Sequence, residues 1–209
     1  MAHHIEAKEP IWLVQGCGLV GMIGCAAALI ADLLGVRLSD HIGLVSDTIS
    51  NLAAGGRWDW LMDYGLYAFV LAVLAVALGT SRWRFDSDWQ WAAGQVLLIV
   101  IAADIFAIAA YEAYSNPQAG PQLHYKFVYL LGIAFPLMAW LTSGGLGSVS
   151  GRMRTPLRVF AVGWALAGPV LFVMPTAWDG LYERVLALLM LAWFALVAWL
   201  LWQHSRSHA

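Results

Sequence analysis

Six long apolar stretches, separated by polar links, occupy most of the 209-residue chain. A helix needs about 20 apolar residues to cross the hydrocarbon core of a bilayer, and each stretch is close to that length. Each is expected to be helical, because backbone groups in lipid must be satisfied within the segment. The pattern predicts an all-α polytopic membrane protein with a six-helix transmembrane bundle. The predicted helices lie at about 11–34, 60–80, 90–114, 123–143, 157–175 and 180–203.

The links differ in length and composition. Residues 35–59 form the one long loop, whereas residues 115–122 are a short turn containing Pro and Gly, and residues 144–156 are Gly-rich and basic. Little of the chain remains outside the stretches and links. A single transmembrane domain is therefore expected to take up residues 1–209.

Composition supports the same class of protein. The chain is 61% hydrophobic and 11% charged, with a mean hydropathy of +0.71. Soluble domains carry roughly 25% charged residues, so a separate soluble domain is not expected. No cleavable signal is expected either, because the first ten residues include acids and lack the pattern of a signal peptide.

Lysine and arginine are unevenly divided between the two ends of the predicted bundle. Cytoplasmic loops of membrane proteins are enriched in these residues. The end with both termini carries more of them, so we predict cytoplasmic N- and C-termini and an outward-facing loop at 35–59. That end has Lys8, Arg82, Arg84, Arg152, Arg154, Arg158 and Arg206, and the other has Arg37, Arg57, Lys126 and Arg184.

Small residues follow one face of the first predicted helix. Cys17, Gly21 and Cys25 are spaced four residues apart, with Gly18 and Gly24 beside them. Small residues at this spacing let helix backbones approach closely. The main interpretation is a contact between helices of one chain, and the alternative is a dimer seam.

Asp104 is an acidic residue well inside the third predicted helix. A carboxylate at that depth costs a few kcal/mol unless it is paired, protonated or hydrated. It is a candidate for ligand binding or for a proton relay. The alternative is a protonated side chain that hydrogen-bonds to a neighbouring helix.

Two histidines, His41 and His124, lie away from the tails at the outer side. They are candidate metal ligands, with Asp47 or Asp104 as a third, and could also serve as axial ligands of a haem. Neither histidine belongs to an HxxxH or HExxH pair, so the cofactor stays open.

The same outer side offers residues for nucleophilic catalysis. Ser50 or Ser46, with His124 and Asp47, could be arranged as a nucleophile and base. No G-x-S-x-G motif is present. The alternative is that the segment SDTISNL is a capped turn that packs the outer loop into the bundle, because Ser, Asp and Asn make local bonds to the backbone.

Glu183 and Arg184 open the sixth predicted helix. One interpretation is a structural clamp in which Arg184 pairs with a carboxylate such as Asp63 or Glu112. The other is a site for an anionic head group or substrate, because a fixed guanidinium matches carboxylate and phosphate geometry.

The chain resembles the DUF998 family of six-helix bacterial and archaeal membrane proteins. The resemblance covers nearly the whole chain and includes the loop pattern S-x-x-x-S-x-L-(G/A) at Ser46, Ser50, Leu52 and Ala53, and a histidine, His124, that opens the fourth helix. The last helix is similar in GLYERVLALLMLAW, with Gly180, Glu183, Arg184 and Trp193. The resemblance implies a six-span fold and a distant likeness to Frag1-type proteins. It also implies a location in the bacterial inner membrane, but it implies no activity.

Three hypotheses for function follow. The leading one is a non-catalytic accessory or scaffold subunit that packs against a larger membrane assembly or lipids, because no complete catalytic motif is present. The second is a protein that binds or transports a lipid or small ligand through Asp104, His124, Glu183 and Arg184. The third is a membrane-embedded hydrolase built on Ser50, Asp47 and His124. Membrane lipids are expected partners and nucleic acid is not.

Overall fold

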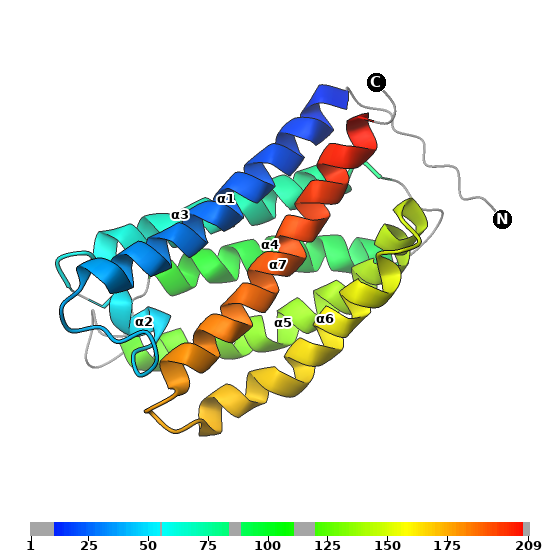
Figure 1. Ribbon diagram of the computed structural model, residues 1–209. Helices are drawn as coiled ribbons and strands as arrows, with labels where there is room; N and C mark the ends of the chain where they lie inside the picture. The colour runs from blue at the N-terminus through cyan, green and yellow to red at the C-terminus, as the bar shows by residue number, and fades with distance from the viewer. Residues whose placement is uncertain (1–10, 55, 84–88, 111–119, 207–209) are drawn as a thin grey trace.

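The computed structural model describes residues 11–54, 56–83, 89–110 and 120–206. These residues contain helices and loops but no strand, and six of the helices are long and apolar enough to cross a membrane, which confirms the predicted fold class. The elements are α1 (Ile11–Leu38), α2 (Ile49–Leu52), α3 (Asp59–Thr80), α4 (Trp89–Ala110), α5 (Gly120–Val149), α6 (Arg154–Ala167), the 3-10 helix η1 (Gly168–Val173) and α7 (Asp179–Arg206) (Figure 1).

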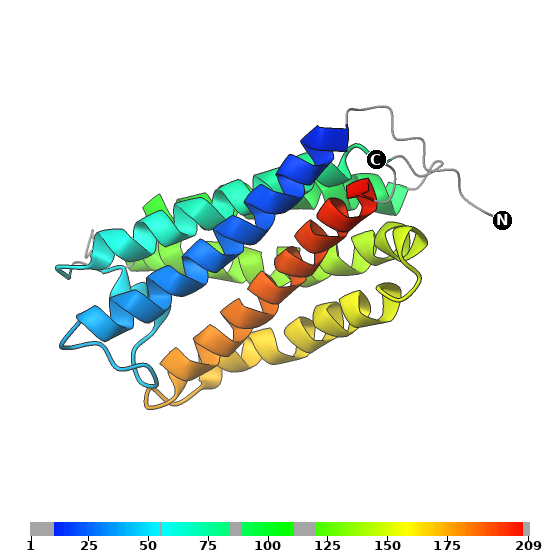
Figure 2. The ribbon, with the colours of Figure 1, turned by 45° about the horizontal axis from the view of Figure 1, so that its top comes forward.

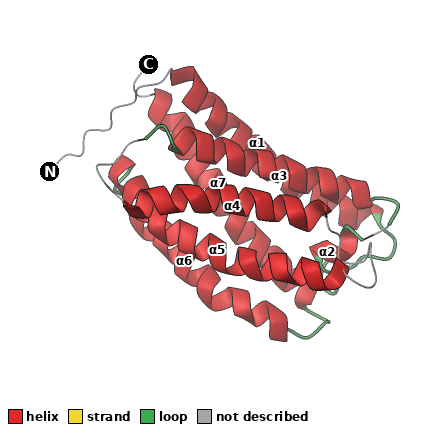
Figure 3. Ribbon diagram, turned by 180° about the vertical axis from the view of Figure 1, so that it is seen from behind, coloured by secondary structure: helices red, strands yellow, loops and turns green. Residues whose placement is uncertain are grey.

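The long helices form one bundle in which α7 runs across the middle. α1 packs against α3 and α7, and α4 lies between α3 and α5 (Figure 3). α6 covers the side formed by α5 and α7. The first residues of α1 and the last of α7 lie at the same end of the bundle (Figure 1, Figure 2), and the link from α1 to α3 lies at the other end.

The small residues of α1 are buried inside this chain. A Cβ atom on Gly24 would collide with Ala68 and lie 2.7 Å from the Cβ of Ala72 in α3, and one on Gly18 would lie 2.6 Å from the carbonyl oxygen of Ala198 in α7. Helix α1 can therefore approach both neighbours only because these positions lack side chains. The contact lies between helices of one chain, as the main interpretation expected.

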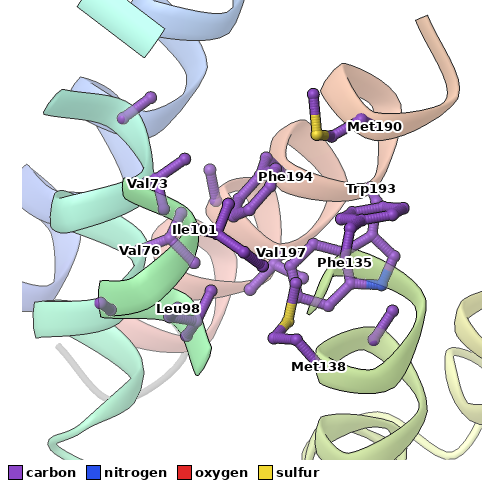
Figure 4. Packing of buried hydrophobic residues seen from close by; sticks show 14 of the residues in the cluster. Val73, Val76, Leu98, Ile101, Phe135, Met138, Met190, Trp193, Phe194 and Val197 are labelled. Atoms are coloured by element: carbon purple, nitrogen blue, oxygen red, sulfur yellow. The ribbon is translucent and has the colours of Figure 1, made fainter. Parts of the chain in front are cut away.

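Aromatic and branched side chains from four helices meet in the centre of the bundle (Figure 4). Phe135 of α5 lies edge-on to Trp193 of α7, with ring centroids 6.0 Å apart, and both are almost fully buried. Val73 of α3 and Ile101 of α4 complete this layer. This layer packs α3, α4, α5 and α7 against one another.

The outward faces of the helices are apolar. Ile23, Val96, Ile133 and Val159 are each more than half exposed. Apolar side chains on both the buried and the exposed faces are typical of helices that lie in lipid. The protein is therefore an integral membrane protein.

Among the described helices, the C-terminal ends of α1 and α5 show clear differences from the predicted bounds, and the fifth span changes its helix type. α1 continues to Leu38 because Gly35 packs closely against Leu52 of α2. α5 continues through its glycines to Val149, since Leu146 is buried and this packing overrides the weak helix propensity of glycine. The fifth span changes from α to 3-10 geometry at Gly168, next to Pro169. The predicted third helix continues to residue 114, but residues 111–114 lie outside those described.

Candidate functional site

The short helix α2 is part of the outer loop and lies at the end of the bundle away from the termini (Figure 1). Thr48 caps it, because its Oγ1 accepts a hydrogen bond from the N–H of Asn51 at 3.1 Å. Leu52 is only 2% exposed and anchors the helix against the bundle. SDTISNL is thus a capped turn packed into the bundle, one of the two interpretations of this segment.

Arg184 holds the loop before α2 in place. Its Nε donates to Asp32 of α1 at 3.0 Å, and its Nη1 donates to the carbonyl oxygens of Asp47 at 2.6 Å and Leu44 at 3.0 Å. Arg184 and Asp32 are 5% and 7% exposed, so this ion pair is buried. Removing one member of a buried pair would leave the other charge uncompensated. The clamp therefore joins α1, the loop and α7.

The partner of Arg184 differs from those suggested by the sequence. It is Asp32, whereas we considered Asp63 and Glu112; Glu112 lies outside the described residues. Asp32 lies inside an apolar span, and the sequence pattern does not distinguish the buried positions of such a span from the lipid-facing ones. One feature of the sequence does indicate a paired role for Asp32, since it is the one charged residue between positions 11 and 34.

Two further contacts fix the loop and α2 against the start of α7. The N–H of Leu181 donates to the carbonyl oxygen of Val45 at 2.9 Å, and the N–H of Ile49 donates to Glu183 Oε2 at 2.7 Å. Gly180 lies so close to the backbone of Asp47 that a Cβ there would collide with it. Glycine at this position is required for the close approach.

Ser50 and His124 lie next to each other. Ser50 projects from α2 and His124 from the start of α5, and Oγ of Ser50 is 2.9 Å from Nε2 of His124. His124 is 5% exposed. The donor of this hydrogen bond depends on which ring nitrogen carries the proton.

The carboxylate of Asp47 makes hydrogen bonds within the outer loop. Its Oδ2 accepts from the N–H of Gly43 at 2.7 Å and from the hydroxyl of Ser46 at 3.0 Å. The carboxylate thus closes a turn of the loop. The structure brings Ser50 and His124 together and places Asp47 and Ser46 in that turn.

A cavity of about 130 Å³ opens beside the Ser50–His124 pair and is partly open to the surface of the bundle. Ser50, His124 and Glu183 are its polar lining residues. The rest of the lining is apolar, apart from the indole N–H of Trp164. It consists of Ile49, Ala53, Leu66, Phe69, Ile105, Ile108, Val128, Leu131, Trp164, Leu171, Leu186, Ala187 and Met190.

The polar lining residues gather at the outer end of this cavity. Glu183 and Met190 both lie on α7, and His124 and Leu131 both lie on α5. Each pair is seven residues apart, which is about 10 Å along a helix at 1.5 Å per residue. The cavity therefore runs from a polar outer end toward the apolar middle of the bundle.

A second cavity, of about 210 Å³, lies on the other side of a shared wall. Asp32 and Arg184 line it, together with apolar residues of α1, α3 and α7. The two cavities share Ile49, Leu66, Phe69, Ala187 and Met190. Arg184 thus belongs to the second cavity, and the Ser50–His124 pair belongs to the first.

Asp104 and His41 lie apart from the Ser50–His124 pair. Asp104 is 3% exposed in α4, lines neither cavity, and neither of its oxygens has a hydrogen-bond partner in the described part of the chain. His41 is exposed in the loop. Within the described ranges, no three His, Cys, Asp or Glu side chains gather where one metal ion could bind.

The model of the family described as "Protein of unknown function (DUF998)" matches residues 22–200. No curated protein and no solved structure matched the chain. The matched range includes the six spans in whole or in large part, the clamp and the Ser50–His124 pair. This chain therefore belongs to the DUF998 family.

Proposed function

We propose that this protein binds a neutral amphipathic lipid in the cavity beside Ser50 and His124. The observation that carries the proposal is the joining of a hydrogen-bonding pair to an apolar cavity at one end of a transmembrane bundle. Binding sites commonly combine an apolar lining with a few polar groups that orient the ligand. This proposal keeps His124 and Glu183 from the ligand-binding hypothesis, adds Ser50, and leaves out Asp104 and Arg184, which do not line this cavity.

The size and position of the cavity suit a hydrocarbon chain. Its volume of about 130 Å³ is comparable to that of an apolar cavity of about 150 Å³ that takes up benzene. It accommodates a short segment of an acyl chain, and the remainder would extend through the opening into the surrounding lipid. The wall of Leu66, Phe69 and Met190 supplies the apolar contacts for that segment.

The head group is expected to be neutral. Ser50 and His124 offer a hydroxyl and an imidazole, and Glu183 offers a carboxyl oxygen. Among the residues that the structure describes, no Lys or Arg lines this cavity, and Arg184 is paired with Asp32. A carboxylate or phosphate would meet no described cation there, and burying an unpaired charge is costly. An alcohol, ester or amide would be accepted.

Photo-crosslinking of the purified protein tests this proposal. The probe is a monoacylglycerol that carries a photoreactive diazirine in its acyl chain, and the comparison is the free fatty acid with the same chain. We expect the monoacylglycerol to crosslink several-fold more than the fatty acid at neutral pH. Equal or stronger crosslinking of the fatty acid would contradict the neutral head group, and no crosslinking of either would contradict the site.

The accessory-subunit hypothesis stays a prediction. The small-residue face of α1 is not available to a partner, because it is buried against α3 and α7 in this chain. The small soluble mass still favours it. Purification from native membranes in mild detergent tests it: a stoichiometric protein partner would support the hypothesis, and a clean monomer would count against it. The same preparation tests the inner-membrane location that the family resemblance implies.

A further inference from the structure

We propose that Ser50 and His124 form a nucleophile–base pair that cleaves an ester of the bound lipid. This inference rests on the proposed function, because it assigns a reaction to the same cavity. The substrate class is a neutral acyl ester whose chain lies in the cavity and whose carbonyl group lies at Ser50. Water is the second substrate.

The geometry of the pair carries the inference. The separation of 2.9 Å between Ser50 Oγ and His124 Nε2 lies within the range of about 2.6–3.2 Å over which a base activates a nucleophile. Both residues line the same cavity, so the pair faces open space on the side where a substrate would lie. A purely structural tie between α2 and α5 would have no need to face a cavity.

The residues around Ser50 hold it firmly although it lies on a short helix. Glu183 accepts from the N–H of Ile49, Thr48 caps α2, and Arg184 binds the carbonyl oxygen of Asp47. These contacts fix the backbone on both sides of the nucleophile. A catalytic pair needs such support, because small displacements of the reacting groups lower the rate sharply.

The reaction proceeds in two halves. In the first, the Ser50 hydroxyl passes its proton to Nε2 of His124 while Oγ bonds to the ester carbonyl carbon. The bond from that carbon to the alcohol oxygen then breaks, and the departing alcohol takes the proton from Nε2. In the second half, water gives a proton to His124 and attacks the acyl-Ser50 ester. The fatty acid leaves, and Ser50 Oγ regains the proton.

Labelling with a long-chain alkyl fluorophosphonate tests the pair directly. Such a probe loses fluoride and forms a bond between phosphorus and an activated serine oxygen. We expect wild-type protein in mild detergent to be labelled at Ser50, as located by peptide mass spectrometry. Ser50→Ala should lose the adduct, and His124→Gln should slow labelling at least about 100-fold, as expected for the loss of a general base. Ser46→Ala in the same loop is the matched control and should label normally.

The same preparations separate this inference from the proposed function. Each variant is also crosslinked with the diazirine monoacylglycerol, which reports on folding and on the cavity without requiring catalysis. Wild-type protein that crosslinks but is not labelled would overturn catalysis and leave lipid binding intact. Catalysis by the pair would also be overturned if labelling persisted in Ser50→Ala, or if His124→Gln were labelled as fast as wild-type protein. Labelling at Ser50 without crosslinking would support the reactive pair and contradict the proposed lipid.

Discussion

Asp32 and Asp104 are buried aspartates in apolar helices, but their surroundings differ. Asp32 accepts two hydrogen bonds from Arg184, whereas Asp104 has no hydrogen-bond partner within the described ranges. Burial of a lone acid in a membrane is costly, and burial of a paired one depends on the pair remaining intact. We therefore expect the same substitution, Asp to Asn, to change the stability of the protein differently at the two positions.

We expect Asp32→Asn to destabilise the protein by about 3 kcal/mol or more, because it leaves Arg184 buried without a counter-charge. Asp104→Asn should leave stability unchanged or raise it, since no described partner is lost. Thermal unfolding of the two purified variants in the same mild detergent measures the difference. Equal losses of thermal stability in both variants would show that the ion pair of Arg184 and Asp32 does not stabilise the protein more than Asp104 does.

Part of the candidate site could be predicted from residue types alone. Ser50, His124 and Glu183 are polar residues at the outer ends of apolar spans, where polar side chains stand out. The hydrogen bond between Ser50 and His124, which are 74 positions apart, depends on how the loop folds over the bundle. The role of Asp32 could not be predicted for the same reason, since its partner Arg184 is 152 positions away. The role of Asp47 is local, because its carboxylate accepts from Gly43 and Ser46, and the capped-turn interpretation of SDTISNL anticipates such bonds.

At the scale of single helices, the close packing of α1 against α3 depends on glycine. Gly24 faces α3 so closely that a Cβ would collide with Ala68, whereas Gly16 on the same helix has no other atoms within 4 Å of a Cβ. Both substitutions to Ala bring the same gain in helix propensity, about 1 kcal/mol. The difference between them therefore isolates the packing of α1 on α3.

We expect Gly24→Ala to cost about 1 to 3 kcal/mol relative to Gly16→Ala, because overpacking forces the two helices apart. The measurement is the apparent melting temperature of each purified variant, with size-exclusion chromatography to confirm that both are monodisperse. If Gly24→Ala is as stable as Gly16→Ala, the close approach of α1 and α3 described here is wrong.

The apolar pattern predicted the helices much better than their ends. Six spans follow from length and hydropathy, since any shorter or more polar segment could not cross the bilayer. The ends of α1 and α5 could not be predicted, because Gly35 packs against Leu52 and the last turns of α5 are held by the burial of Leu146. Such packing overrides the weak helix propensity of glycine-rich segments.

For the whole molecule, the orientation stays a prediction, and the buried clamp changes the residue count on which it is based. Arg184 was one of four basic residues assigned to the outer end, but it is paired inside the bundle, which leaves three against seven at the other end. Of those seven, Lys8 and Arg84 lie outside the described residues. The excess still favours cytoplasmic termini.

Cysteine labelling in intact cells tests this orientation. Cys17 and Cys25 are buried, so the background should be low. Ser46→Cys lies in the exposed outer loop and Arg152→Cys lies in the exposed link between α5 and α6. A membrane-impermeant maleimide should label Ser46→Cys in intact cells and Arg152→Cys only after permeabilisation. The reverse pattern would show that the termini face outward.

A lipid chain is proposed to occupy the cavity beside Ser50 and His124, and substitutions at two neighbouring positions of α5 test that occupancy. Leu131 lines the cavity, whereas Leu130 is 42% exposed on the same helix. Leu131→Trp should fill the cavity, and Leu130→Trp should not. The measurement is crosslinking of each purified variant to the diazirine monoacylglycerol, with the adduct located by mass spectrometry. We predict adducts on cavity-lining peptides in wild type and Leu130→Trp, and a loss of at least about tenfold in Leu131→Trp. Undiminished crosslinking in Leu131→Trp, or adducts confined to the lipid-facing surface, would contradict the account.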